Sequence, residues 1–164
     1  YETPPGRLRL IPGIKNSVII DDSYNSSPIA AETALEALEQ LEITGRKIAL
    51  LGDMLELGKY STSEHLRIGR IAGKVCDILI TAGIRARGMA EGALEAKMSE
   101  KKIFQFEDSL EAGKYLQEII KEGDAVLIKG SQGIRAERAV LEVMLHPEDR
   151  EKLLCRQDEE WSYR

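Results

Sequence analysis

Three short polar segments of the chain carry side chains that could bind a ligand or transfer a proton. The first, residues 21–28, has two carboxylates followed by a tyrosine and an asparagine. Asp22 and Asn25 could bind ribose hydroxyls or the edge of a purine, and the ring of Tyr24 offers a stacking face. The alternative is that Asp22, Ser23 and Asn25 only close turns and cap a helix. Because neighbouring side chains of a strand point to opposite faces, only one of the two aspartates need face the ligand.

The second segment, residues 52–58 (GDMLELG), places Asp53 and Glu56 between two glycines, and His65 follows on the next helical pattern. Two carboxylates and an imidazole could bind a metal or act in acid–base chemistry. Their spacing matches no standard zinc motif, and both acids could equally be solvated or cap a helix. We therefore predict no metal site.

The third segment, residues 129–133 (KGSQG), joins an apolar run to a helical pattern. Backbone N–H groups at such a junction, together with Lys129 and Ser131, can bind a carboxylate or a phosphate. A glycine-assisted turn without a ligand is the alternative. Neither GxxxxGK[ST] nor GxGxxG occurs in the sequence. A self-sufficient phosphate-loop or dinucleotide site is therefore not predicted.

The elements that must position these segments follow from the alternation of apolar runs and helical patterns. Two short strands, expected at residues 7–11 and 17–20, would pair as an antiparallel hairpin. Buried strands are expected at 47–51, 77–81, 102–106 and 124–129, and helices at 28–41, 63–75, 87–98, 108–121 and 134–145. This order predicts an α/β fold with a Rossmann-like, doubly wound, mostly parallel sheet of about six strands and an antiparallel N-terminal strand. Ligands bind such sheets at the carboxyl ends of the strands, where all three polar segments are expected.

The composition is that of an ordinary globular domain, with 43% apolar and 31% charged residues among 164. A net charge of −5 argues against a nucleic-acid partner. No apolar run approaches the length of about 20 residues that a membrane helix needs, so no membrane partner is expected. Cys76 and Cys155 have neither disulfide nor metal spacing, which favours a reducing, cytoplasmic location.

Three regions are expected along the chain. Residues 1–6 (YETPPG) have the composition of an interdomain linker and lack an initiating methionine, so the chain looks like part of a longer protein. Residues 7–146 would form the domain, and residues 147–164 a charged tail with few apolar anchors. The sequence leaves open whether this tail is an amphipathic helix or is disordered.

Three stretches together resemble the C-terminal domain of the Mur ligases, in particular of the members that add D-alanyl-D-alanine. They are IIDDSYNSSP, LLGDMLELG followed by SEHLRIG, and VLIKGSQGIRAE, in the family's order. The resemblance covers about residues 7–144. Ser27, Gln132 and Ala136 depart from the residues usual in that family, which leaves the identity of the incoming amine open.

The resemblance implies an ATP-dependent amide ligase of peptidoglycan precursor synthesis, which activates a peptide carboxylate as an acyl phosphate. ATP and Mg²⁺ would be held mainly by a central domain and the UDP-MurNAc-peptide by an N-terminal domain, both missing from this chain. The chain would close over them with ATP and D-Ala-D-Ala and would be inactive alone. None of its residues would be catalytic. The resemblance assigns ATP contacts to Asp22, Tyr24, Asn25 and Ser27, substrate contacts to Lys129, Ser131, Gln132 and Arg135, and loop or positioning roles to Asp53, Glu56 and His65.

Other functions stay open on the sequence. The chain could be a free-standing Rossmann-like module that binds a nucleotide or a small anion, or part of another amino-acid-adding Mur-type ligase. It could also be an interaction domain whose ligand loops have decayed, as the departures at Ser27 and Gln132 would suggest.

Overall fold

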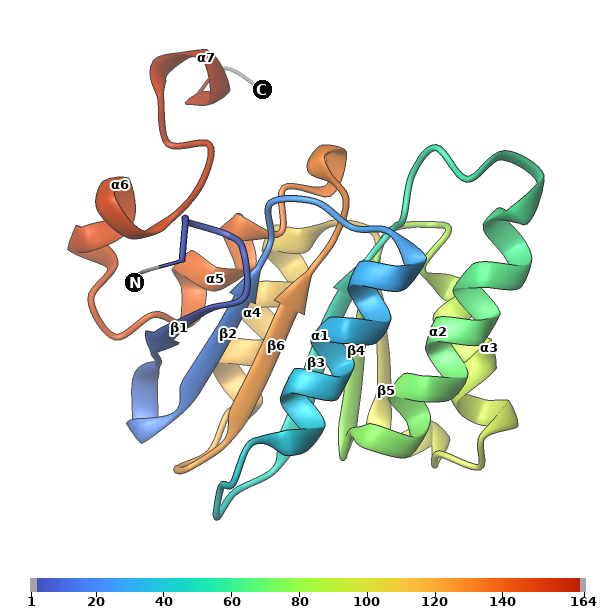
Figure 1. Ribbon diagram of the computed structural model, residues 1–164. Helices are drawn as coiled ribbons and strands as arrows, with labels where there is room; N and C mark the ends of the chain where they lie inside the picture. Colours follow the sequence, from blue (N-terminus) through green and yellow to red (C-terminus); the bar gives the residue numbers. More distant parts are fainter. Residues whose placement is uncertain (1–2, 163–164) are drawn as a thin grey trace.

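A six-stranded sheet forms the centre of the molecule (Figure 1), in a computed structural model that describes residues 3–162. The strand order is β1-β2-β6-β3-β4-β5; β1 is antiparallel to β2, and the other neighbours are parallel. This confirms the predicted α/β class and the antiparallel N-terminal strand. The strands are β1 (Arg9–Pro12), β2 (Val18–Asp22), β3 (Lys47–Gly52), β4 (Ile78–Ala82), β5 (Ile103–Phe106) and β6 (Ala125–Lys129).

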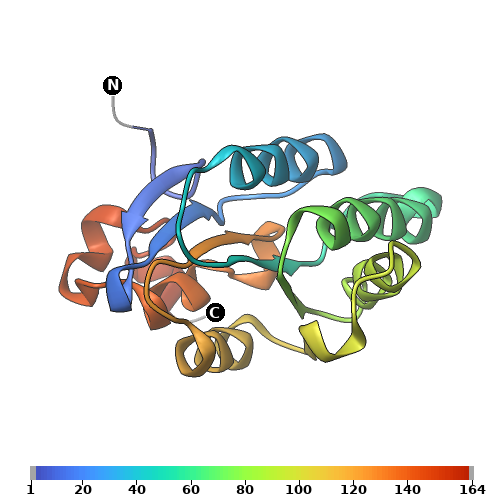
Figure 2. The same cartoon turned by 90° about the horizontal axis from the view of Figure 1, so that it is seen from below.

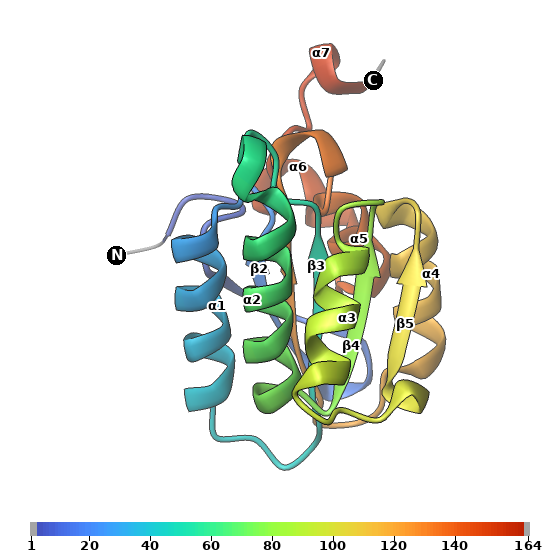
Figure 3. The same ribbon diagram turned by 90° about the vertical axis from the view of Figure 1, so that its right-hand side faces the viewer.

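Helices cover both faces of the sheet (Figures 2 and 3). From β2 the chain crosses to β3 and leaves a gap of one strand, which β6 later fills. It then continues to β4 and β5, and the three helices of these crossovers lie on one face. The chain then returns through the other face and inserts β6 between β2 and β3. The carboxyl ends of β2, β6 and β3 therefore lie where the direction of winding reverses, the usual ligand position in such sheets. The helices of the first face are α1 (Pro28–Gln40), α2 (Ser61–Val75) and α3 (Arg87–Glu95), and those of the second are α4 (Ser109–Ile119) and α5 (Glu137–Val143).

The central strands supply apolar side chains to both layers. In β3, Ile48 and Leu50 pack toward α4 and α5, whereas Ala49 and Leu51 pack toward α1, α2 and α3. All four are at most 1% exposed. Because a strand alternates its side chains, burial on both faces explains the continuous apolar run KIALL.

Two of the helices are cut short where the backbone turns left-handed. Helix α5 begins at Glu137 rather than near residue 134, since a 3₁₀ turn (Gln132–Ile134) and Arg135 at φ 56° precede it. The helix after β4 ends at Glu95, and Lys97 has φ 73°. A positive φ cannot continue a right-handed helix.

The C-terminal residues have structure of their own. After a 3₁₀ turn (Pro147–Asp149) come α6 (Arg150–Leu153) and α7 (Glu159–Ser162). Leu154 is 3% exposed and packs into the apolar layer beside α4 and α5. Among the described residues 3–162, no helix is both long and apolar enough to cross a membrane.

Helices α2 and α3 approach each other through glycines. A Cβ atom at Gly69 would lie 2.1 Å from the carbonyl oxygen of Met89, and one at Gly92 would lie 2.1 Å from that of Leu66. No side chain fits at either position, so the two backbones can touch only because both residues are glycine.

We expect Gly69→Ala to lower the free energy of unfolding by about 1–3 kcal/mol, because the added methyl group forces the helices apart. Elsewhere in a helix the same change usually stabilises by up to about 1 kcal/mol. Urea unfolding of the variant, with Glu91→Ala on the exposed side of α3 as control, measures the difference. A Gly69→Ala protein as stable as the wild type would contradict the close approach.

Candidate functional site

The three polar segments meet at the carboxyl edge of the sheet. Asp22 at the end of β2 and Leu51 near the end of β3 both lie opposite Lys129 of β6. Beyond the strands, the backbone N–H of Ser131 donates to the carbonyl of Asp53 at 2.9 Å. Residues more than 70 positions apart in sequence thus form one continuous edge, as the strand-end argument predicted.

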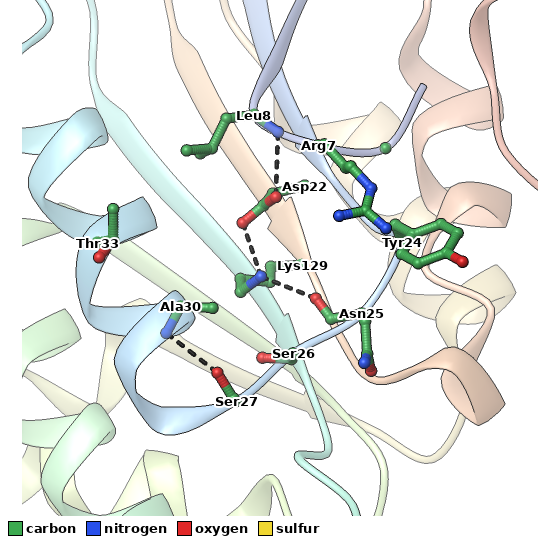
Figure 4. A pocket seen from close by; sticks show the side chains of 11 residues that line it. Arg7, Leu8, Asp22, Tyr24, Asn25, Ser26, Ser27, Ala30, Thr33 and Lys129 are labelled. Carbon is green, nitrogen blue, oxygen red and sulfur yellow. Dashed lines mark hydrogen bonds and ion pairs between the residues drawn. The ribbon is translucent and has the colours of Figure 1, made fainter. Parts of the chain in front are cut away.

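A pocket of about 350 Å³ opens between the ends of β2 and β6 and the start of α1 (Figure 4). All four residues predicted to contact ATP line it, and so does Lys129, which was predicted with a different segment. Its lining comprises Gly6, Arg7, Leu8, Asp22, Tyr24, Asn25, Ser26, Ser27, Ala30, Thr33 and Lys129.

A buried ion pair forms the floor of this pocket. Lys129 Nζ lies 2.7 Å from Asp22 Oδ2 and donates to the carbonyl of Asn25 at 2.8 Å. The backbone N–H of Leu8 donates to Asp22 Oδ1 at 3.0 Å. Lys129 is only 2% exposed, so its charge requires the carboxylate beside it. The pair fixes the strand ends and the Asn25 turn in one arrangement.

The rim of the pocket carries aromatic and cationic groups. Tyr24 is 44% exposed, and the guanidinium carbon of Arg7 lies 4.2 Å from the centre of its ring. Ser27 accepts a hydrogen bond from the Ala30 N–H at 3.2 Å and so caps α1. The sequence did not single out Arg7 as a site residue, because it follows a segment with the composition of a linker. The one feature that could have indicated it is a cationic side chain directly after Pro-Pro-Gly.

Asp53 and His65, from the second segment and the helix after it, are hydrogen-bonded to nearby backbone groups. His65 is 1% exposed; its Nε2 accepts from the Met54 N–H at 3.0 Å, and its Nδ1 lies 2.7 Å from the carbonyl of Ser61. An imidazole that accepts at one nitrogen and donates at the other is neutral. Asp53 Oδ1 accepts from the Ala86 N–H at 2.7 Å. Both side chains therefore organise loops, and a ligand role for them stays a prediction.

Neither Glu56 nor any other described residue forms a set of metal ligands with Asp53 and His65. Glu56 is exposed, with φ 63°. Among residues 3–162, no three His, Cys, Asp or Glu side chains are arranged to hold a metal ion.

The third segment divides between two places. Ser131 is 3% exposed, and its Oγ accepts from the Leu55 N–H at 2.8 Å, which ties the second segment to the third. Gln132 is exposed. Arg135 contacts Glu137 and lines a separate pocket of about 270 Å³. The four predicted substrate contacts are thus not gathered in one pocket.

Asp21 points away from the pocket and is fully buried. Its Oδ1 accepts from both the N–H and the hydroxyl of Ser23, at 3.2 and 2.5 Å. No described residue donates a hydrogen bond to its Oδ2. Burial raises the pKa of this carboxyl to about 6, and the nearby charges of Asp22 and Glu137 act in the same direction.

Comparison with known proteins agrees with this geometry. Residues 6–132 match the family described as Mur ligase, glutamate ligase domain. The chain belongs to the Mur ligase family. The resemblance seen in the three polar segments is thereby confirmed.

The relatives of this Mur ligase domain are about three times as long as the chain. A UDP-N-acetylmuramoyl-tripeptide–D-alanyl-D-alanine ligase of Bacillus subtilis is 32% identical over 142 residues, which are 86% of this chain and 31% of the relative. A crystal structure of the MurF ligase of Thermotoga maritima in complex with ADP has a TM-score of 0.71 at 32% identity, covering 93% of this chain and 33% of that one. A MurF structure from Acinetobacter baumannii has a TM-score of 0.73 at 29% identity, covering 85% and 30%.

We expect Asp21→Asn to change how stability depends on pH. The folded pKa of about 6 exceeds the ordinary 3.8, so the native state binds more protons between these values. Stability conferred by protonated Asp21 is therefore lost as the pH rises through this window. From about pH 4 to pH 8, the free energy of unfolding of the variant should rise by about 2 kcal/mol relative to that of the wild type.

Urea unfolding at both pH values measures this gain. The exposed Asp149→Asn is a matched control, which should follow the wild type at each pH. If the Asp21→Asn and wild-type curves stay parallel, the carboxyl titrates at its ordinary pKa.

Proposed function

We propose that the chain is the C-terminal domain of an ATP-dependent ligase that adds D-alanyl-D-alanine to UDP-MurNAc-tripeptide. The product would serve peptidoglycan synthesis, and hence cell shape and division, in the cytoplasm. The names of the relatives support the reaction, and the ADP in a similar structure supports a nucleotide as ligand. The observation that carries the proposal is the pocket of about 350 Å³ where the winding of the sheet reverses.

The groups of the pocket suit the adenosine part of ATP. Asp22 uses one lone pair of each oxygen for Leu8 and Lys129, and each oxygen keeps a second to accept a ribose hydroxyl. Tyr24 offers a half-exposed ring for stacking, and the exposed Asn25 offers donors and acceptors to a purine edge. Arg7 supplies positive charge at the rim. ATP and Mg²⁺ would be held mainly by the central domain of the longer protein.

The incoming D-Ala-D-Ala would meet the third segment. An ammonium group has three donors, and Lys129 uses two of them, for Asp22 and Asn25. The third remains for the carboxylate of the dipeptide. Gln132 is exposed on the same loop and could contact the peptide, whereas Ser131 positions this loop through Leu55.

Exposed apolar side chains mark the face that the rest of the ligase would cover. Ile29 at the start of α1, Tyr60 before α2 and Ile84 after β4 are 60–77% exposed. All three follow the carboxyl ends of strands, on the same edge as the pocket. Closure of the central domain over this edge would bury them and exclude water from an acyl phosphate.

We expect Asp22→Asn in the full-length ligase to raise the KM for ATP about 10- to 100-fold, the loss typical of one charged hydrogen bond. Asparagine keeps an oxygen for Leu8 but leaves the buried Lys129 ammonium without its carboxylate, so the variant should also lose about 3–5 kcal/mol of stability. Circular dichroism at the assay temperature therefore first has to show that the variant is folded. Glu36→Gln, on the exposed side of α1, is the matched control and should leave the KM unchanged. An unaltered KM in folded Asp22→Asn protein would make Asp22 a turn residue only.

The 164-residue chain alone should neither hydrolyse ATP nor form the amide bond, because it has no phosphate-binding loop. Incubation with ATP, Mg²⁺, UDP-MurNAc-tripeptide and D-Ala-D-Ala, followed by phosphate release and mass spectrometry, tests this. The coding sequence upstream should contain a GKT-type loop. Robust ligation by the isolated chain would contradict the proposal that the central domain is needed for the reaction.

A further inference from the structure

The C-terminal segment, residues 147–162, packs behind the Tyr24 turn of the pocket. It lies beyond the residues 6–132 that match the family. Leu154, Cys155 and Arg156 are each less than 10% exposed. Cys155 Sγ lies 3.7 Å from the hydroxyl of Ser23. The segment is therefore anchored in the core on one side and touches the site on the other.

Arg156 binds the backbone of the turn directly. Its Nη1 donates to the carbonyl of Ser23 at 3.1 Å, and its Nη2 donates to the carbonyl of Tyr24. The same Nη1 lies 2.9 Å from Glu137 Oε2. A planar guanidinium can hold several acceptors in fixed directions, which an ammonium cannot.

Tyr24 is thus held from both ends of the chain. Its N–H donates to the carbonyl of Gly6 at 2.9 Å, while its carbonyl accepts from Arg156. The guanidinium of Arg7 lies 4.2 Å from the centre of the ring and that of Arg156 lies 5.5 Å from it. These contacts leave the tyrosine little freedom to leave the edge of the pocket.

Arg156 is itself fixed by its surroundings. Its partner Glu137 is 1% exposed and also contacts Arg135, so two guanidinium groups share one buried carboxylate. The centre of the Trp161 ring in α7 lies 5.0 Å from the guanidinium carbon of Arg135 and 5.5 Å from that of Arg156. Arg156 adopts φ 55°, a conformation that a residue with a side chain keeps only when its contacts hold it there.

We propose that Arg156 is a positioning residue of the nucleotide site and that residues 147–162 form a strap that holds Tyr24 as a stacking face. The inference rests on the proposed function, because it gives the strap a role in binding ATP. Strap docking and nucleotide binding are then coupled, and each favours the other by the same factor. The tail, which the sequence showed as charged with few apolar anchors, would then be part of the site.

Steady-state kinetics of the full-length ligase tests the strap. Arg156→Ala should raise the KM for ATP about 10-fold, because Tyr24 would no longer be held where a base can stack on it, and should leave the KM for D-Ala-D-Ala within about 2-fold. Arg156→Lys should bind ATP better than Arg156→Ala but less well than the wild type, because lysine keeps the positive charge and lacks the planar guanidinium that donates to several acceptors. Arg150→Ala removes an exposed arginine of the same segment and should match the wild type.

Hydrogen exchange of the 164-residue chain provides a measurement without nucleotide. The Tyr24 amide should exchange at least about 10-fold faster in Arg156→Ala, or in Arg156→Lys if the alanine variant does not fold, than in Arg150→Ala. The intrinsic fluorescence of Trp161, the chain's single tryptophan, reports whether α7 stays docked.

The outcomes separate the strap from the proposed function. A wild-type ligase with no ATP-dependent ligation would refute the proposed function. If the wild type ligates but Arg156→Ala keeps its KM for ATP, the strap has no role in binding. Unchanged Tyr24 exchange, or equal losses for both substrates, would likewise overturn the inference, because Arg156 would then act only on general stability.

Discussion

The ion pair between Asp22 and Lys129 is the interaction on which the site depends. It joins the ends of β2 and β6, the two strands between which the winding of the sheet reverses. An ammonium that is 2% exposed is tolerated only beside a carboxylate, so β6 must stay in register with β2. Through the Asn25 carbonyl the same ammonium also fixes the turn after β2. Removing either charge would leave the other buried without its partner, at a cost of about 3–5 kcal/mol, and would disturb the register of the two strand ends and the shape of the pocket.

Much of the fold could be predicted from periodicity because burial on both faces of a strand leaves a continuous apolar run. KIALL, DILIT and DAVLIK each correspond to a central strand. The spatial order could not be predicted in the same way, since nothing in the pattern around residues 124–129 says that β6 lies between β2 and β3. For that reason Lys129 was grouped with the loop after its own strand, although its side chain lines the pocket of the first segment.

The predicted site residues also separate by how their polar groups are satisfied. Asp53, His65 and Ser131 have the chemistry of ligand contacts, yet each is buried and bonded to backbone groups of neighbouring loops. Buried polar groups must find partners, and strand-end loops without regular structure offer many unpaired N–H groups. Residue type alone therefore cannot distinguish a loop-organising carboxylate from one that binds a ligand. Arg7 illustrates the converse, because only the fold brings this linker-adjacent cation over Tyr24.

Two consecutive aspartates show how one strand end serves two purposes. Alternation turns Asp22 toward α1, where Lys129 compensates its charge, and Asp21 toward α5, where burial and Glu137 disfavour ionisation. The Arg156 guanidinium lies on the Asp21 side, bound to Glu137 and to the carbonyls that follow. The peptide of Tyr24 connects the two sides, so the position of its ring depends on groups on both faces of the sheet. The affinity for a nucleotide stacked on that ring would therefore depend on the C-terminal segment without direct contact, through the backbone of a single turn.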